Sequence, residues 1–128
     1  MRFALTAEHA AFRDAASELL AKECALPVVR AAWEAPAGQL DRGVWERLDE
    51  MGVLAMLVPE SQAGLGLDEC ALVPVLEETG RYALPHPIVE TAMVAAPLGL
   101  RGLVATDLGT TGGAPGGGLV PCAADADV

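Results

Sequence analysis

The sequence predicts an all-α protein in which helical hairpins pack as an up-and-down bundle. Three observations lead to this prediction. Apolar residues recur at three- and four-residue steps over several stretches, which is the periodicity of one helix face. Residues that cap helix N-termini stand directly before these stretches. Alanine is abundant, whereas aromatic residues make up only 4% of the chain, and this composition suits closely packed helices better than paired strands.

The first helix is predicted to begin after Thr6, with Glu8 in the first turn, where the helix dipole favours an acidic side chain. Its buried stripe would consist of Phe12, Ala16, Leu19 and Leu20. Pro27 is expected to stop or kink this helix, with residues 28–33 continuing at an angle. A loop is predicted over residues 35–39 because they contain both Pro and Gly.

A second helix is predicted to begin after Asp41, which can cap it, and to end at Gly52. Its buried face would comprise Val44, Trp45, Leu48 and Met51. A short apolar run follows at residues 53–58 and is stopped by Pro59 and a glycine-rich turn. A run this short predicts a buried segment that crosses between two helical hairpins rather than another helix.

A third helix is predicted to begin after Asp68. Its buried face would comprise Leu72, Val75, Leu76 and Thr79, and its solvent face Glu77, Glu78 and Arg81. Pro74 lies within this helix, where it requires a kink. A fourth helix is predicted over residues 88–96, with Pro87 in its first turn and Pro97 at its end.

The character of the sequence changes after the last of these helices. We predict a helical domain over residues 1–104 and a flexible glycine-rich linker over residues 105–118. Residues 119–128 would then open a new unit that is cut off, and the family resemblance described below implies that this unit is the start of a truncated β-domain.

Composition excludes several classes of protein. The chain of 128 residues fits one domain, and 52% of its residues are hydrophobic, which disfavours a disordered tail. The net charge of -10 argues against nucleic-acid partners, because phosphate binding depends on clustered Lys and Arg. No apolar run approaches transmembrane length and no secretory signal is recognised, so we expect no membrane partner and a cytoplasmic location. The three cysteines are expected to be buried or half-buried in a reducing compartment.

Several residue patterns resemble parts of a metal site or a catalytic site, but the rest of the sequence does not complete any of them. His86 and Glu90 have the i, i+4 spacing of metal ligands, yet no third ligand is evident, so we expect a surface histidine and no metal site. The adjacent Glu77 and Glu78 diverge on a helix and cannot act on one substrate atom. Neither Ser17 nor Ser61 has a histidine at a recognisable spacing.

A series of motifs resembles the N-terminal helical domain of acyl-CoA dehydrogenases. The series is a helix ending in Gly52, an apolar crossing, a Pro59-Glu60 pair, the turn GLGL at residues 64–67 and a helix ending in EETG at residues 77–80. The later stretch PHPIVETAMVAAPLG is similar to the branch of the family common in actinobacterial lipid and steroid degradation. The sequence departs from the family over residues 99–118, where a further helix is expected and a Gly-rich stretch stands instead.

The resemblance implies a role in α,β-desaturation of an acyl-CoA thioester. In the family, three domains together hold FAD and the substrate, and the catalytic base is a glutamate of a C-terminal domain that this chain lacks. The resemblance therefore assigns no catalytic, flavin-binding or metal-binding residue here, and we expect the chain alone neither to catalyse nor to retain FAD.

The helix after Pro87 lines the acyl pocket in the family, and the matching positions are Glu90, Thr91 and Val94. Two readings stay open for these residues, an acyl-pocket wall or simply core packing with one solvated charge. Two functions also stay open. The chain is part of such an enzyme, in homo- or hetero-oligomers, or it is a non-catalytic helical subunit that docks on a fuller dehydrogenase.

Overall fold

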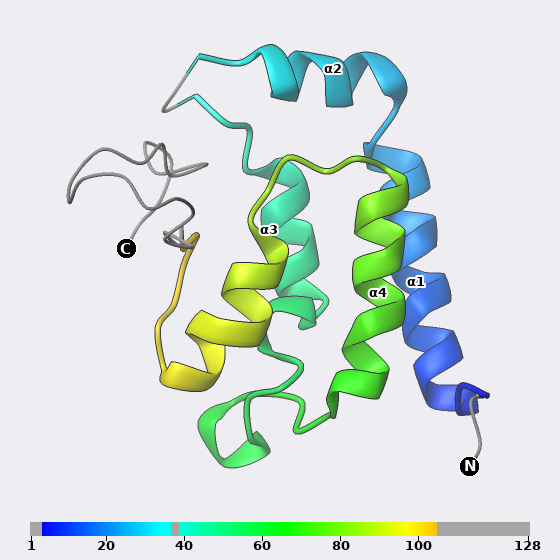
Figure 1. Cartoon of the computed structure of the whole chain (residues 1–128), viewed down its shortest axis with the longest axis vertical. Helices are drawn as coiled ribbons and strands as arrows, with labels where there is room; N and C mark the ends of the chain where they lie inside the picture. Colours follow the sequence, from blue (N-terminus) through cyan, green and yellow to red (C-terminus); the bar gives the residue numbers. More distant parts are fainter. Residues whose placement is uncertain (1–3, 37–38, 105–128) are drawn as a thin grey trace, which may run out of the picture.

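The computed structural model describes residues 4–36 and 39–104. The predicted all-α bundle is confirmed, and no strand occurs among these residues. Helix α1 (Ala7–Glu23) and helix α4 (Glu69–Arg81) lie side by side, and α3 (Gly43–Glu50) packs beside them (Figure 1). Helix α2 (Leu26–Glu34) crosses one end of the bundle, whereas the helical segment that begins at Ile88 runs down next to α3.

The helix starts follow from the predicted capping residues. The Thr6 side chain accepts a hydrogen bond from the backbone N–H of His9 at 3.1 Å, and Asp68 accepts one from Ala71 at 3.1 Å. Each bond satisfies an N–H group that has no partner within the helix. At α3 the cap is displaced by one residue. Arg42 is the N-cap, while the Asp41 carboxylate accepts from the N–H of Gly43 at 3.0 Å.

Helix α1 ends at Glu23, before Pro27, so Pro27 does not kink a single helix. It occupies the first turn of α2, where its missing N–H costs no hydrogen bond. Val29 is the one buried residue of α2, and the exposed Trp33 side chain donates to the carbonyl of Ala83 at 2.7 Å. Helix α2 is thus held to the bundle by few contacts.

The core contains residues of α1, α3 and α4. Its fully buried large side chains are Leu20, Leu48, Met56, Leu72, Leu103, Val53 and Val75. The predicted crossing segment is buried as expected at Val53, Leu54, Met56 and Val58, although residues 53–55 form the 3-10 turn η1 (Val53–Ala55). A second 3-10 turn, η2 (Glu60–Gln62), follows it.

The glycine-rich turn folds back on this crossing segment. Backbone N–H groups of Leu65, Gly66 and Leu67 donate to carbonyls of Ala55, Val58 and Met56 at 2.8–3.1 Å. Gly52 ends the preceding helix in the left-handed conformation, at a φ of 87°, which glycine adopts without a steric penalty. The motif GLGL therefore holds the crossing segment in place through backbone hydrogen bonds.

Glu78 was predicted to face water, and this prediction is wrong. The residue is 5% exposed, and its carboxylate lies between α1 and α4. Ser17 of α1 donates to Oε2 at 2.9 Å, and the Arg81 guanidinium lies 3.3 Å from Oε1. These partners compensate for the loss of water around a buried carboxylate. The Ser17 hydroxyl is thus a structural group that ties α1 to α4.

Replacing Ser17 with alanine is expected to lower the free energy of unfolding by about 2 kcal/mol, because one hydrogen bond to a buried carboxylate is lost. Urea denaturation followed by circular dichroism measures this change. The matched control is Ser61→Ala on the exposed η2 turn, which should leave stability unchanged. Equal effects of the two variants would contradict the tie between α1 and α4.

His86 is also buried, contrary to the expected surface position. It is 9% exposed, its Nε2–H donates to the Asp41 carbonyl at 2.7 Å, and its ring stacks on Trp45 with centroids 6.2 Å apart. The histidine thus links the chain before helix 88–98 to the start of α3. No group of three His, Cys, Asp or Glu side chains suited to a metal occurs in the described part of the chain.

The cysteine prediction is correct for Cys24 and wrong for Cys70, which is exposed; Cys122 lies outside the described residues. Burial raises the pKa of the Cys24 thiol, and the neighbouring Glu23 carboxylate adds to the rise.

Of the helices in the described ranges, none combines the length and apolar character that crossing a bilayer requires. The domain boundaries stay predictions, and the predicted linker and β-domain start lie outside the described residues.

Candidate acyl-binding helix

The helical segment from Ile88 to Leu98 differs from the regular helix predicted over residues 88–96. It becomes a π-helix, η3 (Glu90–Ala95), followed by the 3-10 turn η4 (Ala96–Leu98). The N–H of Ala96 donates to the carbonyl of Thr91, and that of Leu100 donates to Ala95 at 3.0 Å, both five residues back. Pro97 does not end the helix, because it occupies the first turn of η4, where its lack of an N–H is tolerated. Single π turns of this kind are frequent at functional sites.

The helix has a buried side and an exposed side. Ile88, Thr91, Ala92 and Ala95 are buried against the core. The outer face of this helix carries the exposed apolar side chains Val89, Met93, Val94 and Leu98. We call these four residues the outer apolar face. Soluble proteins seldom expose such a group of large apolar side chains without a binding role.

The three predicted site residues do not share one face. Val94 belongs to the outer apolar face and is 48% exposed, and Glu90 is half-buried at its edge. Thr91 is buried on the opposite side, and its hydroxyl accepts a hydrogen bond from the N–H of Val104 at 3.4 Å. Only Glu90 and Val94 are therefore available to a ligand on the outer side.

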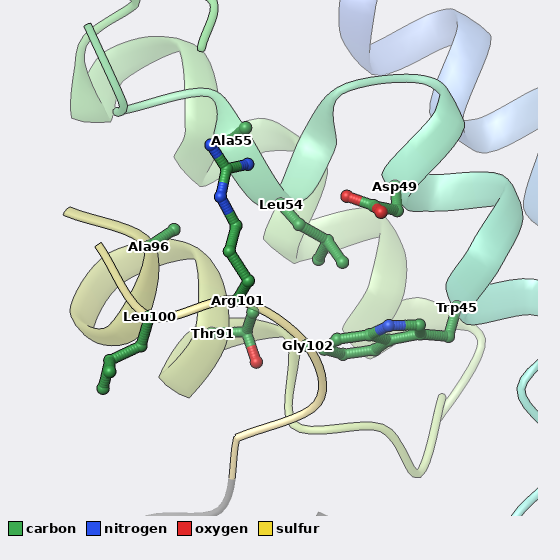
Figure 2. Close-up of a pocket in the computed structure, with 9 residues that line it drawn as sticks. All are labelled: Trp45, Asp49, Leu54, Ala55, Thr91, Ala96, Leu100, Arg101 and Gly102. Atoms are coloured by element: carbon green, nitrogen blue, oxygen red, sulfur yellow. The ribbon is translucent and has the colours of Figure 1, made fainter. Parts of the chain in front are cut away.

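A small cleft of about 80 Å³ lies on the inner side of this helix. Figure 2 shows the Trp45 ring reaching from α3 toward Gly102, with the Arg101 side chain extending toward Ala55 across the cleft. The Arg101 guanidinium donates to the carbonyl of Gln62 at 3.1 Å. Pockets for organic ligands hold roughly 300–1,000 Å³, so this cleft is too small for an acyl chain or a nucleotide.

A wider hollow of about 390 Å³ lies along α2 and is lined largely by alkyl groups of Pro27, Val28, Ala31, Ala32 and Ala35. Gln39 and Asp41 are the polar residues on its rim. No Lys or Arg is among the described residues that line this hollow, so its lining is unsuited to a phosphate-bearing cofactor.

Comparison with known protein families decides what this bundle is. The sequence profile of the family described as "Acyl-CoA dehydrogenase, N-terminal domain" matches residues 6–105, which is most of the chain. The chain belongs to the acyl-CoA dehydrogenase family.

Two curated acyl-CoA dehydrogenases named IpdE2 are similar to this acyl-CoA dehydrogenase domain. The protein from Mycolicibacterium smegmatis is 30% identical over 95 residues, covering 73% of this chain and 30% of its own length. The protein from Mycobacterium tuberculosis is 29% identical over 92 residues, covering 71% of this chain and 29% of its own length. The chain thus spans about 30% of the length of these relatives.

A solved structure described as a variant of the Tcur3481-Tcur3483 steroid ACAD is similar in fold. Its TM-score is 0.62 at 30% sequence identity, and the match covers 69% of this chain and 24% of the other. The family recognised from the sequence motifs is therefore confirmed, and the solved structure among these relatives is described as a steroid enzyme.

Sequence reasoning missed several residues that shape this part of the acyl-CoA dehydrogenase domain. Trp45 was predicted only as core, and the roles of Arg101 and Val104 were not predicted. The partners of Arg101 and Val104 lie 39 and 13 residues away in sequence, so helical periodicity carries no signal for them. The one available cue was the absence of polar residues in the LV pair at 103–104, which indicates burial.

Proposed function

We propose that this chain forms the N-terminal part of a flavin-dependent acyl-CoA dehydrogenase, which desaturates an acyl-CoA thioester at its α and β carbons. Family membership supports the class of enzyme. The activity, the acyl-CoA substrate and the flavin belong to the whole enzyme, because the chain spans only about 30% of its curated relatives. One relative is described as a steroid enzyme, so lipid and steroid side-chain thioesters are the substrates to test first.

The observation that carries the proposal is the outer apolar face of helix 88–98. Its inner side is fixed in the core, whereas Val89, Met93, Val94 and Leu98 present alkyl groups outward. A thioester tail needs such an apolar wall with one or two polar groups, and Glu90 at the edge supplies a polar group. We therefore assign Glu90, Thr91 and Val94 to the wall, with Glu90 and Val94 facing the acyl chain and Thr91 supporting the helix from behind.

The flavin is not assigned to residues of this chain. FAD would supply the hydride acceptor in the intact enzyme. Neither hollow described above combines the volume with the cationic or backbone donors that its phosphates require. We derive no step through the flavin and propose that the cofactor and the catalytic base are held by other parts of the enzyme, so this chain alone does not catalyse.

The first test is to isolate the protein from its native cells and to measure its intact mass and flavin absorbance. The proposal expects a mass well above 13.2 kDa with bound flavin. A species of 13.2 kDa without flavin would contradict it and would favour the second candidate below.

The acyl wall itself is tested by Val94→Asp in the flavin-containing enzyme. A carboxylate on an apolar wall is expected to lower kcat/KM for the acyl-CoA by about tenfold or more, because its hydration is lost against the acyl chain. The matched control is Val73→Asp on α4, since Val73 is 47% exposed against 48% for Val94 and lies off the proposed wall. The wall assignment is wrong if both variants keep the wild-type kcat/KM or lose it equally.

A second candidate is a non-catalytic helical subunit that docks on a fuller dehydrogenase. The exposed Val73 of α4 and the outer apolar face favour it, because uncovered apolar side chains on these helices promote association. Size-exclusion chromatography of the chain with a candidate dehydrogenase subunit tests it, and separate elution would exclude that pairing. Homo- or hetero-oligomers and a cytoplasmic location remain part of either proposal.

A further inference from the structure

The buried hydroxyl of Thr91 has a partner that an acyl-pocket role does not explain. The side chain is 2% exposed and lies on the side of the helix opposite the outer apolar face. Threonine hydroxyls inside helices commonly bond back to a carbonyl of the preceding turn, as Thr79 does to Leu76 at 2.8 Å. Thr91 instead accepts from the backbone N–H of Val104, 13 residues further along the chain.

The segment of residues 100–104 is attached to the bundle through four of its five residues. The Leu100 N–H donates to the carbonyl of Ala95, and the Arg101 guanidinium donates to the carbonyl of Gln62. Leu103 is fully buried in the core, and Val104 is buried beside Thr91. Figure 2 shows Thr91 next to the part of this segment that carries Arg101 and Gly102.

The Arg101 and Leu103 side chains anchor their own residues to the bundle, but neither gives the backbone N–H of Val104 a hydrogen-bond partner. Its N–H is buried away from water, and a buried N–H without a partner is strongly disfavoured. The Thr91 hydroxyl removes that penalty. It therefore fixes the position of Val104 relative to helix 88–98.

We propose that Thr91 is a positioning residue whose hydroxyl clamps the 100–104 segment to helix 88–98, rather than a residue that contacts the acyl chain. The clamp holds the inner side of the helix, so that Glu90 and Val94 keep a constant orientation on its outer side. The clamp itself does not depend on the proposed function. Only the statement that the outer side of the helix is the acyl wall rests on that function.

The test compares amide hydrogen exchange, resolved by residue with NMR, in the 128-residue chain without acyl-CoA or flavin. Thr91→Val keeps the shape of the side chain and removes the acceptor, so exchange at Val104 should accelerate by about tenfold or more. Thr91→Ser retains a hydroxyl and should restore slow exchange. Thr79→Val, which removes a hydroxyl bonded within α4, should leave Val104 unchanged.

Two outcomes overturn the clamp. One is unchanged exchange at Val104 in Thr91→Val. The other is an equal acceleration at α4 core amides such as those of Leu72 and Val75, since that pattern indicates a general packing role. If Thr91→Val does not fold, exchange in the wild-type chain still tests the clamp. A Val104 amide that exchanges as fast as a solvent-exposed amide without a hydrogen bond would exclude it. Failure here leaves the flavin and mass measurements unaffected, so it is distinguishable from failure of the proposed function.

Discussion

Replacing Gly64 with alanine is expected to lower the free energy of unfolding by about 3 kcal/mol or more, the largest effect of any methyl group added to the GLGL turn. A Cβ at this position would lie 2.0 Å from the carbonyl oxygen of Val58 and 2.4 Å from its Cβ. The same carbonyl accepts the N–H of Gly66 at 2.8 Å. The backbone must therefore move, and the hydrogen bonds between the GLGL turn and the crossing segment are lost.

The matched control is Gly80→Ala near the end of α4. Apart from its chain neighbours and the backbone of its own helix, no described atom lies within 4 Å of the position where its Cβ would be placed. Because alanine favours a helix by about 1 kcal/mol over glycine, this variant should equal or exceed the wild type in stability. Urea denaturation followed by circular dichroism measures both changes. A Gly64→Ala protein as stable as the wild type would show that the turn does not pack on Val58.

Replacing Trp45 with alanine is the second change with a large expected effect. The indole is 5% exposed, belongs to the main core, stacks on His86 and borders the cleft beside Thr91. Truncation of a buried tryptophan costs about 3–5 kcal/mol, because burial is lost and a cavity remains. The loss should also release His86 and with it the start of helix 88–98.

Trp33→Ala is the matched control for this prediction. Trp33 is 63% exposed and makes one hydrogen bond, to the Ala83 carbonyl, so its removal should cost about 1 kcal/mol. Guanidinium denaturation of both variants, followed by circular dichroism, compares the two losses without relying on tryptophan fluorescence. A similar loss for both variants would contradict the assignment of Trp45 to the core.

Local rules predicted the helices and most of the core of this domain. Thr6 and Asp68 cap helices because a short oxygen-bearing side chain satisfies a nearby N–H, which requires no knowledge of the tertiary fold. Gly52 ends α3 for an equally local reason, its left-handed φ. The buried stripes follow from periodicity, and the order of motifs identified the family.

The errors concern polar residues whose partners are distant in sequence. Glu78 looked like one of two solvent-facing carboxylates, but Ser17, 61 residues earlier, meets it across the interface of α1 and α4. His86 is buried because Asp41 and Trp45 approach it from another hairpin. Of the site residues, Val94 is exposed and Glu90 is half-buried, and their role in a pocket wall stays a prediction. The π-helix that contains all three predicted site residues has no signal in helical periodicity.

The burial of Leu103 has a consequence for how the domain folds during synthesis. This side chain follows every described helix in sequence and belongs to the same core cluster as residues of α1, α3 and α4. A nascent chain that ends before it leaves a gap in that core, and the long-range packing of α1 on α4 has to form without it. Ribosome-bound chains are therefore expected to stay incompletely packed until residue 103 has emerged, and then to fold in one cooperative step.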